Sequence, residues 1–455
     1  MSTPSLDEVD VAVIGAGNVG IAVAYYLVKE QGITRVALVD PRDPMSLTSA
    51  QSGENYRNWW PHPTMTAFTD HSIRLMEQLD EATGGRIAMT RGGYSLVTRR
   101  KHPQDLVDDL YRVYRDTPGK IRIRETAGDY RAPVRTPWQA APDGVDVLLD
   151  TDLIRRTFPT YAHDVQTVIH IRRAGSISGQ QLGQVMLEEI RAAGGRLVRA
   201  EVKGITAASP FVLDLATATG ARTLRAARIV NAAGPFVKDI GAMLGEALPV
   251  KCVYQQKIAF QDREGAIPRQ MPFTIDLDGL TLAWSDEDRE LLAGDPATRK
   301  LVEPMPGGIH CRPDGAVDGT WIKMGWAYNE QAGDPHGEDP VDPQFPDSLL
   351  RAGSRLHPAL AAYIGHLPRG ARHYGGYYAM TQENWPLIGR MTTDGAFIAG
   401  ALSGYGSMGA CAAGSLCAAW VAGEPVPAYA KVLDGSRYAD AALMDELRAL
   451  GTGAL

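Results

Sequence analysis

Three glycines and one acid near the start of the chain have the types and spacing of a nucleotide site. Gly15, Gly17 and Gly20 form the pattern GxGxxG, and Asp40 follows the third glycine by twenty residues. In dinucleotide-binding proteins the first glycine permits a tight turn, the second lets the backbone approach the pyrophosphate, and the third lets helix and strand pack closely. A carboxylate such as that of Asp40 accepts hydrogen bonds from ribose hydroxyls and disfavours a 2′-phosphate. The pattern therefore predicts a dinucleotide site.

The segments around these glycines read as the elements that such a site needs. Residues 9–15, VDVAVIG, are almost wholly apolar, which is typical of a strand buried on both faces. Residues 21–32 have apolar side chains at helical spacing and end in a glycine, and residues 34–40 read as a second buried strand. The helix N-terminus would offer free N–H groups to phosphates. A glycine-rich turn without a ligand is the alternative, but it leaves the acid after the second strand unexplained.

A second segment whose side chains could bind or act on a ligand is SGENYRNWWPHP, residues 52–63. It contains Arg57 and His62 beside the adjacent Trp59 and Trp60. Adjacent residues in an extended segment point in opposite directions, so the sequence is compatible with one tryptophan in a pocket and the other in the core. Packing of the whole segment in the core is the alternative.

The bulk properties indicate a soluble globular protein of two interleaved domains. The chain has 455 residues, of which 44% are apolar and 22% charged. The net charge of −7 argues against a nucleic-acid surface, which would need a basic excess. Cys252, Cys311, Cys411 and Cys417 form no CxxC pair, so we predict neither a metal site nor a disulfide framework, and a reducing cytoplasm is expected.

Two apolar stretches are long enough to test as membrane spans. They are residues 9–28 and the uncharged residues 395–423. Both are rich in glycine at positions that suit turns around a ligand, so we expect neither to cross a membrane. The N-terminal segment is polar and acidic and lacks the pattern of a signal peptide.

Later parts of the chain return to alternating α and β patterns. Residues 175–205 read as loop, helix and strand, and residues 228–245 as strand, glycine turn and helix. Residues 395–423 read as a strand and a glycine-rich turn that opens a helix of small residues. A second helix N-terminus is thus available to face a cofactor. Residues 334–346, rich in Pro and Asp, are expected to form a surface loop.

At this point the chain resembles the D-amino-acid-oxidase-type flavoprotein superfamily. The pattern is similar to sarcosine oxidase-like and glycine oxidase-like amine oxidases, and AYYLVKEQGITRVALVD is similar to the β subunit of multi-subunit sarcosine oxidases. The segments GSIS, IVNAAGPF, GTWIKMGW, WPLIG and IAGALSGYGSMG occur in the family order over roughly residues 9–425. Together they are specific for the superfamily and not for a substrate.

The resemblance implies an α/β fold, α+β overall, in which a Rossmann-type FAD-binding domain is combined with a discontinuous mixed-sheet substrate domain. The FAD-binding domain would comprise residues 1–95, 150–245 and 371–430. The substrate domain would comprise residues 96–149 and 246–370, and residues 431–455 would form a C-terminal helical tail.

The resemblance also implies FAD as the cofactor. Gly376 stands where related oxidases have the cysteine that bonds covalently to the flavin, so noncovalent FAD is predicted, with a histidyl link through His62 as the alternative. Gly404, Gly406, Ser407 and Met408 would close over the pyrimidine end of the flavin. The residues predicted to bind the cofactor are Gly15, Gly17, Asn18, Val19, Gly20, Asp40, Pro41, Arg42, Ser49, Ser52, Val202, Ala233, Gly234, Gly404, Tyr405, Gly406, Ser407 and Met408.

The chain departs from the family at the groups that hold a substrate carboxylate. Met408 stands where a lysine pairs with that carboxylate in the family, and the glycine oxidase-like arginine has no counterpart. A buried carboxylate without a partner is costly. Either another cation serves, with Arg57 the best placed in the sequence and Arg312 next, or the substrate is not a small amino acid held in the usual way.

Lys323, in WIKMGW, matches the family lysine over the flavin that is tied to oxygen activation. A cation there stabilises negative charge as an electron passes to O2. The histidine that follows four residues later in the family is Ala327 here. The candidate catalytic residues are Lys323, Arg57, Tyr378, Tyr405 and His62.

The implied reaction is oxidation of a C–N bond in an amine or amino acid of the secondary-amine, N-methyl or D-amino-acid type. A hydride equivalent would pass to flavin N5, the imine would hydrolyse, and O2 would be reduced to H2O2. Two alternatives stay open: an FAD-dependent dehydrogenase of an amine or 2-hydroxy acid, and a flavin-carrying subunit of a larger complex. The substrate, the oligomeric state and any general base are not determined by the sequence.

Overall fold

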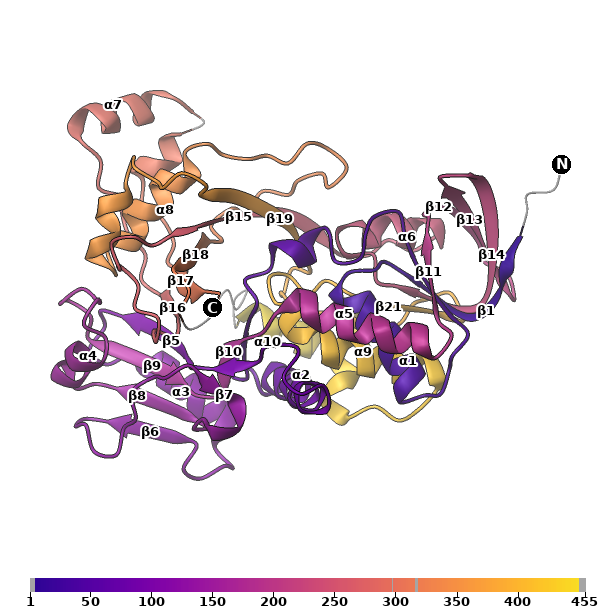
Figure 1. Cartoon of the computed structure of the whole chain (residues 1–455), viewed down its shortest axis with the longest axis horizontal. Helices are drawn as coiled ribbons and strands as arrows, with labels where there is room; N and C mark the ends of the chain where they lie inside the picture. Colours follow the sequence, from indigo (N-terminus) through magenta and orange to yellow (C-terminus); the bar gives the residue numbers. More distant parts are fainter. Residues whose placement is uncertain (1–4, 297, 316–317, 450–455) are drawn as a thin grey trace.

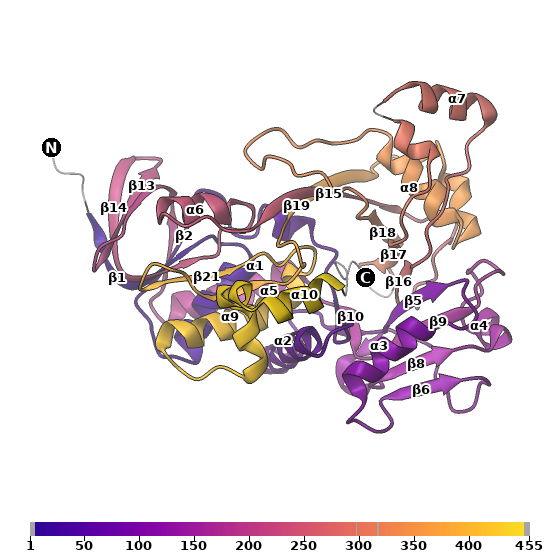
Figure 2. The same cartoon turned by 180° about the vertical axis from the view of Figure 1, so that it is seen from behind.

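The structure is a computed structural model that describes residues 5–296, 298–315 and 318–449. Figure 1 shows an elongated molecule in which one sheet lies near the N-terminus and a second, larger sheet forms the opposite lobe. The helices α1, α2, α5 and α9 lie between these two ends in both views (Figures 1 and 2). Among the described residues, no helix has the length and apolar character needed to cross a membrane.

The first sheet has eight strands and a mostly parallel centre. Its order is β11, β2, β1, β14, β13, β12, with β21 beside β14 and β20 beside β21. The pairs β11–β2, β2–β1, β1–β14 and β14–β21 are parallel. The strands are β1 (Ser5–Ile14), β2 (Val36–Asp40), β11 (Arg196–Arg199), β12 (Glu201–Thr206), β13 (Phe211–Thr217), β14 (Gly220–Asn231), β20 (Leu387–Arg390) and β21 (Ala396–Gly400).

Both faces of this sheet are covered, which explains the unbroken apolar runs in the sequence. Val11 and Val13 of β1 pack in a core with α1, α5 and α9, whereas Ala12 and Ile14 pack on the other side with β12–β14 and α6. A strand buried on both faces has no polar alternation. The strand, helix and strand predicted around the glycines are therefore confirmed, although the second strand begins at Val36 rather than at residue 34.

The second large sheet has nine strands. Its order is β19, β15, β18, β17, β16, β5, β9, β8, β6. The strands are β5 (Tyr94–Thr98), β6 (Ile121–Arg124), β8 (Val145–Leu148), β9 (Thr167–Ile171), β15 (Lys251–Gln261), β16 (Phe273–Asp276), β17 (Ile309–Asp314), β18 (Trp321–Trp326) and β19 (Arg372–Met380). A small sheet lies between the two, formed by β3 (Asn55–Arg57), β10 (Ala174–Ser176), β4 (Thr90–Arg91) and β7 (Thr136–Pro137).

Ten α-helices are described, with short 3₁₀ turns between elements. The α-helices are α1 (Asn18–Lys29), α2 (Pro63–Ala82), α3 (Gln104–Tyr114), α4 (Thr151–Thr157), α5 (Gly179–Ala192), α6 (Val237–Met243), α7 (Asp286–Gly294), α8 (Phe345–Ser354), α9 (Gly406–Ala422) and α10 (Ala441–Ala449). The 3₁₀ turns are η1 (Thr48–Gln51), η2 (Trp138–Ala140), η3 (Gly234–Phe236), η4 (Arg299–Val302), η5 (Pro358–Tyr363), η6 (Ala428–Leu433) and η7 (Gly435–Ala439).

The predicted division into domains stays a prediction, but two of its ranges contain strands of the other sheet. β9 and β19 fall in segments assigned to FAD binding, yet they pair with β8, β5 and β15 in the nine-stranded sheet. The predicted loop at 334–346 has no helix or strand up to residue 344, after which α8 begins at Phe345.

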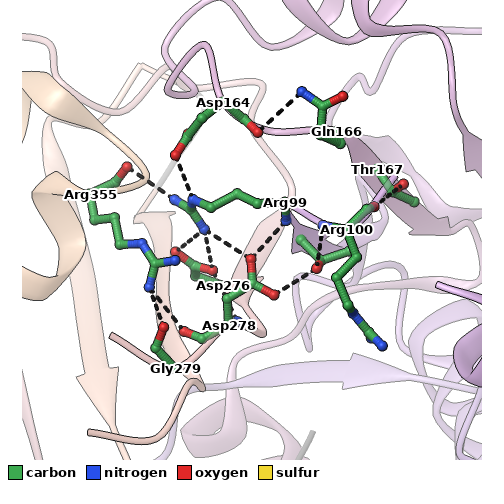
Figure 3. Close-up of polar contacts among 10 residues, drawn as sticks. Arg99, Arg100, Asp164, Gln166, Thr167, Asp276, Asp278, Gly279 and Arg355 are labelled. Carbon is green, nitrogen blue, oxygen red and sulfur yellow. Dashed lines mark hydrogen bonds and ion pairs between the residues drawn. The ribbon is translucent and has the colours of Figure 1, made fainter. Parts of the chain in front are cut away.

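An ion network fixes the end of β5 to the end of β16 in the large sheet (Figure 3). Arg99 donates to Asp276 at 2.8 Å, pairs with Asp278 at 3.3 Å and with Asp164 at 2.9 Å, and donates to the carbonyl oxygen of Arg355 at 3.1 Å. The Asp276 side chain is 1% exposed. Burial raises the pKa of the Asp276 carboxyl, and Arg99 opposes that rise. The guanidinium is thus the counter-charge of a carboxylate that water does not reach.

We predict that Arg99→Met destabilises the protein by about 3 kcal/mol, because removing one partner leaves a buried carboxylate uncompensated. The neighbouring Arg100 provides a matched control, since its ion pair with Asp105 is exposed. Arg100→Met should change stability by less than about 0.5 kcal/mol. Thermal or urea unfolding measures both. Equal effects of the two substitutions would contradict this description of the network.

Candidate active site

The glycine turn after β1 is a point where three segments meet without room for a side chain. Gly15 has φ +111°, and a Cβ on it would lie 2.2 Å from the carbonyl oxygen of Ala232, the residue after β14. A Cβ on Gly20 would lie 2.0 Å from the carbonyl oxygen of Gly15. The amide of Gly15 donates to the carbonyl oxygen of Val39 at 2.8 Å. Helix α1 therefore starts in direct contact with the carboxyl ends of β1, β2 and β14, where ligands of such sheets bind.

Asp40 at the end of β2 fixes this turn from one side. Its Oδ2 accepts from the amide of Ala16 at 2.8 Å, and its Oδ1 accepts from the amide of Arg42 at 2.8 Å. An ionised carboxylate has about four acceptor sites, so Asp40 keeps capacity for ligand hydroxyl groups. Asp40 and Arg42 both line a cavity of about 450 Å³.

Two helix N-termini open on one cavity. The N-cap residues Gly17 of α1 and Tyr405 of α9 have no capping side-chain hydrogen bond. Nδ2 of Asn18 in the first turn of α1 donates to Oγ of Ser407 in the first turn of α9 at 3.0 Å. The amide of Asn18 donates to Oγ of Ser49 at 3.1 Å, and the positive dipole ends of both helices are available to an anionic ligand. The cavity that Asn18 and Ser407 line has a volume of about 800 Å³.

The two cavities are neighbouring parts of one crevice. They share the lining residues Gly17, Thr48, Ser49, Ala232, Gly234 and Pro235. The crevice leads from Asp40 to Tyr378 and Gly406, so it joins the first sheet to the nine-stranded sheet. An elongated ligand with an anionic middle fits this arrangement.

Most residues predicted to bind the cofactor line this crevice. The exceptions are Gly20, Pro41, Val202, Tyr405 and Met408, which line neither cavity. Gly20 acts through the close packing described above. Tyr405 is buried, donates to the carbonyl oxygen of Asn384 at 2.8 Å and contacts the Trp60 ring edge to face, so it belongs to the core.

The predicted catalytic residues are only partly brought together. Tyr378 lines the larger cavity, whereas Arg57, His62, Lys323 and Tyr405 line neither. Arg57 is 1% exposed, with its guanidinium carbon 4.4 Å from the ring centre of Trp60 and 4.8 Å from that of Tyr94. It is therefore stacked between aromatic rings rather than directed into the crevice.

His62 and the two tryptophans have structural positions. Nδ1 of His62 accepts from the amide of Thr64 at 3.1 Å and caps α2, and Nε2 lies 3.4 Å from Glu446. Burial lowers the pKa of His62. Trp59 and Trp60 are 0% and 7% exposed, and they line neither cavity. Both tryptophans therefore pack in the core, and neither forms part of the crevice.

One face of the nine-stranded sheet carries the polar side of the crevice. Strand alternation places Tyr374, Gly376 and Tyr378 of β19 on the same face as Lys257 of β15. The opposite face carries apolar residues such as Ile258 and Met324, which pack with α8 in a separate core. We call the face that carries Lys257, Tyr374, Gly376 and Tyr378 the open face.

Lys257 is a cavity residue that the sequence analysis missed. It lines the larger cavity, is 6% exposed, and donates from Nζ to the hydroxyl oxygen of Tyr378 at 3.2 Å. The available signal was a lysine inside the otherwise strand-like run VYQQKIAF, but the pattern could not show which face it occupies.

Lys323 and Arg312 also lie on the open face, where two carboxylates neutralise them. Nζ of Lys323 is 2.9 Å from Glu54 and 3.4 Å from Asp314. Arg312 is 2.9 Å from Asp314 and 3.6 Å from Glu54, and its Nε donates to the carbonyl oxygen of Gly53 at 2.9 Å. Burial raises the pKa of Asp314, but Arg312 and Lys323 outweigh it and hold this pKa below its usual value.

No cysteine lines the crevice. All four cysteines are buried elsewhere, and Gly376 stands on the cavity wall, where a Cβ would meet Gln51 at 3.4 Å. Within the described residues, no group of His, Cys, Asp or Glu is arranged to hold a metal ion.

Comparison with known proteins gives three kinds of similarity. A family model described as FAD dependent oxidoreductase (DAO) matches residues 10–420. Human mitochondrial dimethylglycine dehydrogenase is 26% identical over 305 residues, which is 65% of this chain and 31% of that protein. The chain thus matches about a third of the length of that curated relative.

Solved structures share the fold across nearly the whole chain. L-proline dehydrogenase from P. horikoshii has a TM-score of 0.71 at 18% identity and covers 96% of this chain and 99% of its own. Iminodiacetate oxidase from Chelativorans sp. BNC1 has a TM-score of 0.66 at 21% identity, with coverage of 93% and 98%. Glycine oxidase from Geobacillus kaustophilus has a TM-score of 0.65 at 19% identity, with coverage of 92% and 96%. These similarities confirm the predicted fold class.

We predict that Gly20→Ala removes bound cofactor and destabilises the protein by about 3 kcal/mol, because its Cβ would overlap the carbonyl oxygen of Gly15. Gly294→Ala is the control, since a Cβ there meets nothing within 4 Å. Flavin absorbance after gel filtration and the melting temperature measure both effects. Full cofactor content in Gly20→Ala would refute the close-packing argument.

Proposed function

The chain belongs to the DAO family of FAD-dependent oxidoreductases, and we propose that it uses noncovalent FAD to oxidise a C–N bond in a small amine or amino acid, with O2 as the final acceptor. The relatives named above act, by their names, on dimethylglycine, proline, iminodiacetate and glycine. All are small amines or amino acids, which supports this substrate class.

The observation that carries the proposal is the crevice between the two sheets. It presents Asp40 for ribose hydroxyls, the first turn of α1 with Ser49 for a pyrophosphate, and the first turn of α9 for the far end of the cofactor. Glycines form much of its wall, so the backbone can approach a ligand closely. The residues present therefore fit FAD.

Noncovalent binding is supported by the residues around the crevice. The four cysteines are buried away from it, and His62 caps α2 outside it. Gly376 offers no side chain for a bond. FAD released by denaturing the protein would support noncovalent binding, and flavin that stays with the denatured chain would refute it.

FAD, when bound, supplies the acceptor for the two electrons taken from the substrate. The chain's own residues form the pocket that orients the amine and limits the access of water to it. The substrate loses a hydride from its α-carbon and a proton from its nitrogen, and the resulting imine takes up water to give a carbonyl compound and an amine or ammonia. Tyr378 and Lys257 are two polar residues of the large sheet that line this space.

The final acceptor is the point on which two functions differ. A cation near the redox centre favours O2, because it stabilises the charge that forms when oxygen takes an electron, and Lys323 lies on the open face for this role. A dehydrogenase that passes electrons to another acceptor is the second candidate. The observation that favours it is the pairing of Lys323 with both Glu54 and Asp314.

We predict that the purified protein contains one FAD per chain and that amines or amino acids bleach its flavin absorbance without air. With air, the same compounds should release hydrogen peroxide. A screen of secondary amines, N-methyl amino acids and D-amino acids measures both responses. A protein that cannot bind FAD would refute the proposal, and one that holds FAD but is bleached by none of these compounds would favour a role as a subunit of a larger complex.

We predict that Lys323→Met slows reoxidation of the reduced protein by air by about 10²-fold, as expected for loss of one preorganised charge. Stopped-flow absorbance measures the rate. Arg372→Met is the control, because Arg372 lies in the same cross-strand row at the exposed edge of the sheet. Slow reoxidation of the unsubstituted protein would contradict O2 as the acceptor, and an unchanged rate in Lys323→Met would exclude Lys323 from this role.

A further inference from the structure

We infer that Lys257, together with the hydroxyl of Tyr378, binds the carboxylate of the substrate, so that the protein acts on an amino acid rather than on a simple amine. This inference rests on the proposed function and names the substrate class of the same site. It also answers the question raised by Met408, because the cation that the family places there is absent from this sequence.

The sheet positions Lys257 at the crevice and gives it space. Lys257 lies on β15 directly between Gly325 of β18 and Tyr374 of β19. Gly325 has no side chain, and a Cβ there would lie 3.1 Å from Cγ of Lys257 and 2.5 Å from Nε2 of His310. The absence of a side chain at Gly325 leaves room for the aliphatic stem of Lys257 on one side and for the ring of His310 on the other. Lys257 also lines the cavity.

The charge of Lys257 has no counter-charge in the described part of the chain. Its ammonium group donates a hydrogen bond to Tyr378, and no carboxylate of the described residues forms an ion pair with it. Lys323 and Arg312, on neighbouring strands of the same face, each contact two carboxylates. A lysine that is 6% exposed and faces only a neutral hydroxyl is costly to keep, unless a ligand brings the missing negative charge.

The neighbour on the other side of Gly325 is His310, and an imidazole is neutral or positive, so it cannot supply a negative charge. Burial and the positive charge of Lys257 lower the pKa of His310 to about 4, so His310 is neutral at pH 7. Its Nδ1 lies 3.0 Å from the carbonyl oxygen of Gly308 and is thus already engaged. Because no described carboxylate pairs with Lys257 and the lysine lines the cavity, we infer that its negative partner enters through the cavity.

A carboxylate matches the donors present. An ammonium group has three donors and Tyr378 adds a hydroxyl, so two oxygen atoms of one small group can be bound side by side. The Tyr378 ring is held in place by Gly404, where a Cβ would lie 2.6 Å from it. Lys257 lines only the larger cavity, whereas Asp40 and Arg42 line the other, so the residues proposed for the cofactor's ribose lie in a different cavity from Lys257.

The other cations suggested by the sequence are already engaged. Arg57 is stacked between Trp60 and Tyr94, outside the crevice. Arg312 is paired with Asp314 and Glu54 and bound to the backbone at Gly53. Lys257 is thus the buried cation that lines the crevice without a paired carboxylate in the described chain.

The test uses the FAD-loaded protein with isobutyrate and its neutral isostere isobutyramide as probes, and it measures binding by thermal shift and by perturbation of the flavin spectrum. Isobutyrate should bind at least tenfold more tightly than isobutyramide. Lys257→Met should weaken isobutyrate binding at least tenfold and leave isobutyramide binding unchanged. Lys257→Arg should restore most of the difference, and Tyr378→Phe should weaken isobutyrate binding by a smaller factor.

A second measurement separates ligand binding from a structural role. Because a methionine removes an uncompensated buried charge, Lys257→Met should raise the melting temperature without ligand. Lys251→Met, at the exposed start of the same strand, is the matched control and should change neither property. A structural lysine would give a lower melting temperature and unchanged isobutyrate binding, which would overturn the inference.

Two further outcomes assign a failure to its source. If Lys257→Met loses FAD while isobutyrate still protects the remaining loaded protein, Lys257 serves the cofactor and the inference is wrong although the proposed function stands. If the unsubstituted protein binds FAD and oxidises only amines without a carboxylate, the inference is again wrong. If it binds no FAD, the proposed function itself fails.

Discussion

The contact between helices α1 and α9 is the constraint on which the rest of the structure depends. At Gly414 a Cβ would lie 2.5 Å from the backbone of Ala22, so the helices touch without an intervening side chain. At their N-terminal ends, Asn18 donates to Ser407 across a sequence separation of 389 residues. Because the helices are this close, both positive ends meet at one cavity and can act on the same anionic ligand. This helix pair lies against the glycine turn, the ends of β1 and β14, and the cavity wall.

The nine-stranded sheet contributes through the difference between its two faces. Ile258, Cys311 and Met324 form the apolar core on one face, whereas Lys257, Arg312 and Lys323 occupy the other. Glu54 links helix α5 to the nine-stranded sheet, because one of its oxygens accepts from the amide of Gly179 at 3.0 Å while the other pairs with Lys323. The charges on the open face are therefore tied to α5, and a shift of this helix relative to the nine-stranded sheet would break contacts that water only partly reaches.

The sequence allowed prediction of the site residues whose positions depend on local pattern. It did not allow prediction of those whose positions depend on which strands pair. Gly15, Gly20 and Asp40 could be read because their spacing is set by one strand, one turn and one helix. Lys257 could not, because a lysine in a strand faces a site or solvent according to its neighbours, and these come from residues around 325 and 374. Arg57 was expected at the substrate because of its type, yet its neighbours Trp60 and Tyr94 enclose it. The spacing of residues along the sequence does not show that a guanidinium will stack between two aromatic rings.

The long separation between Asn18 and Ser407 also has a consequence for biosynthesis. During synthesis Asn18 precedes Ser407, which helps to complete the crevice, by 389 residues. Until then the apolar side of α1 that packs on α9 has no cover, and β1 waits for β14. The nascent chain thus carries exposed apolar surface while the residues in between are being synthesised, and such surface makes a folding intermediate prone to aggregation. The crevice can therefore form only after the residues of α9 have been synthesised.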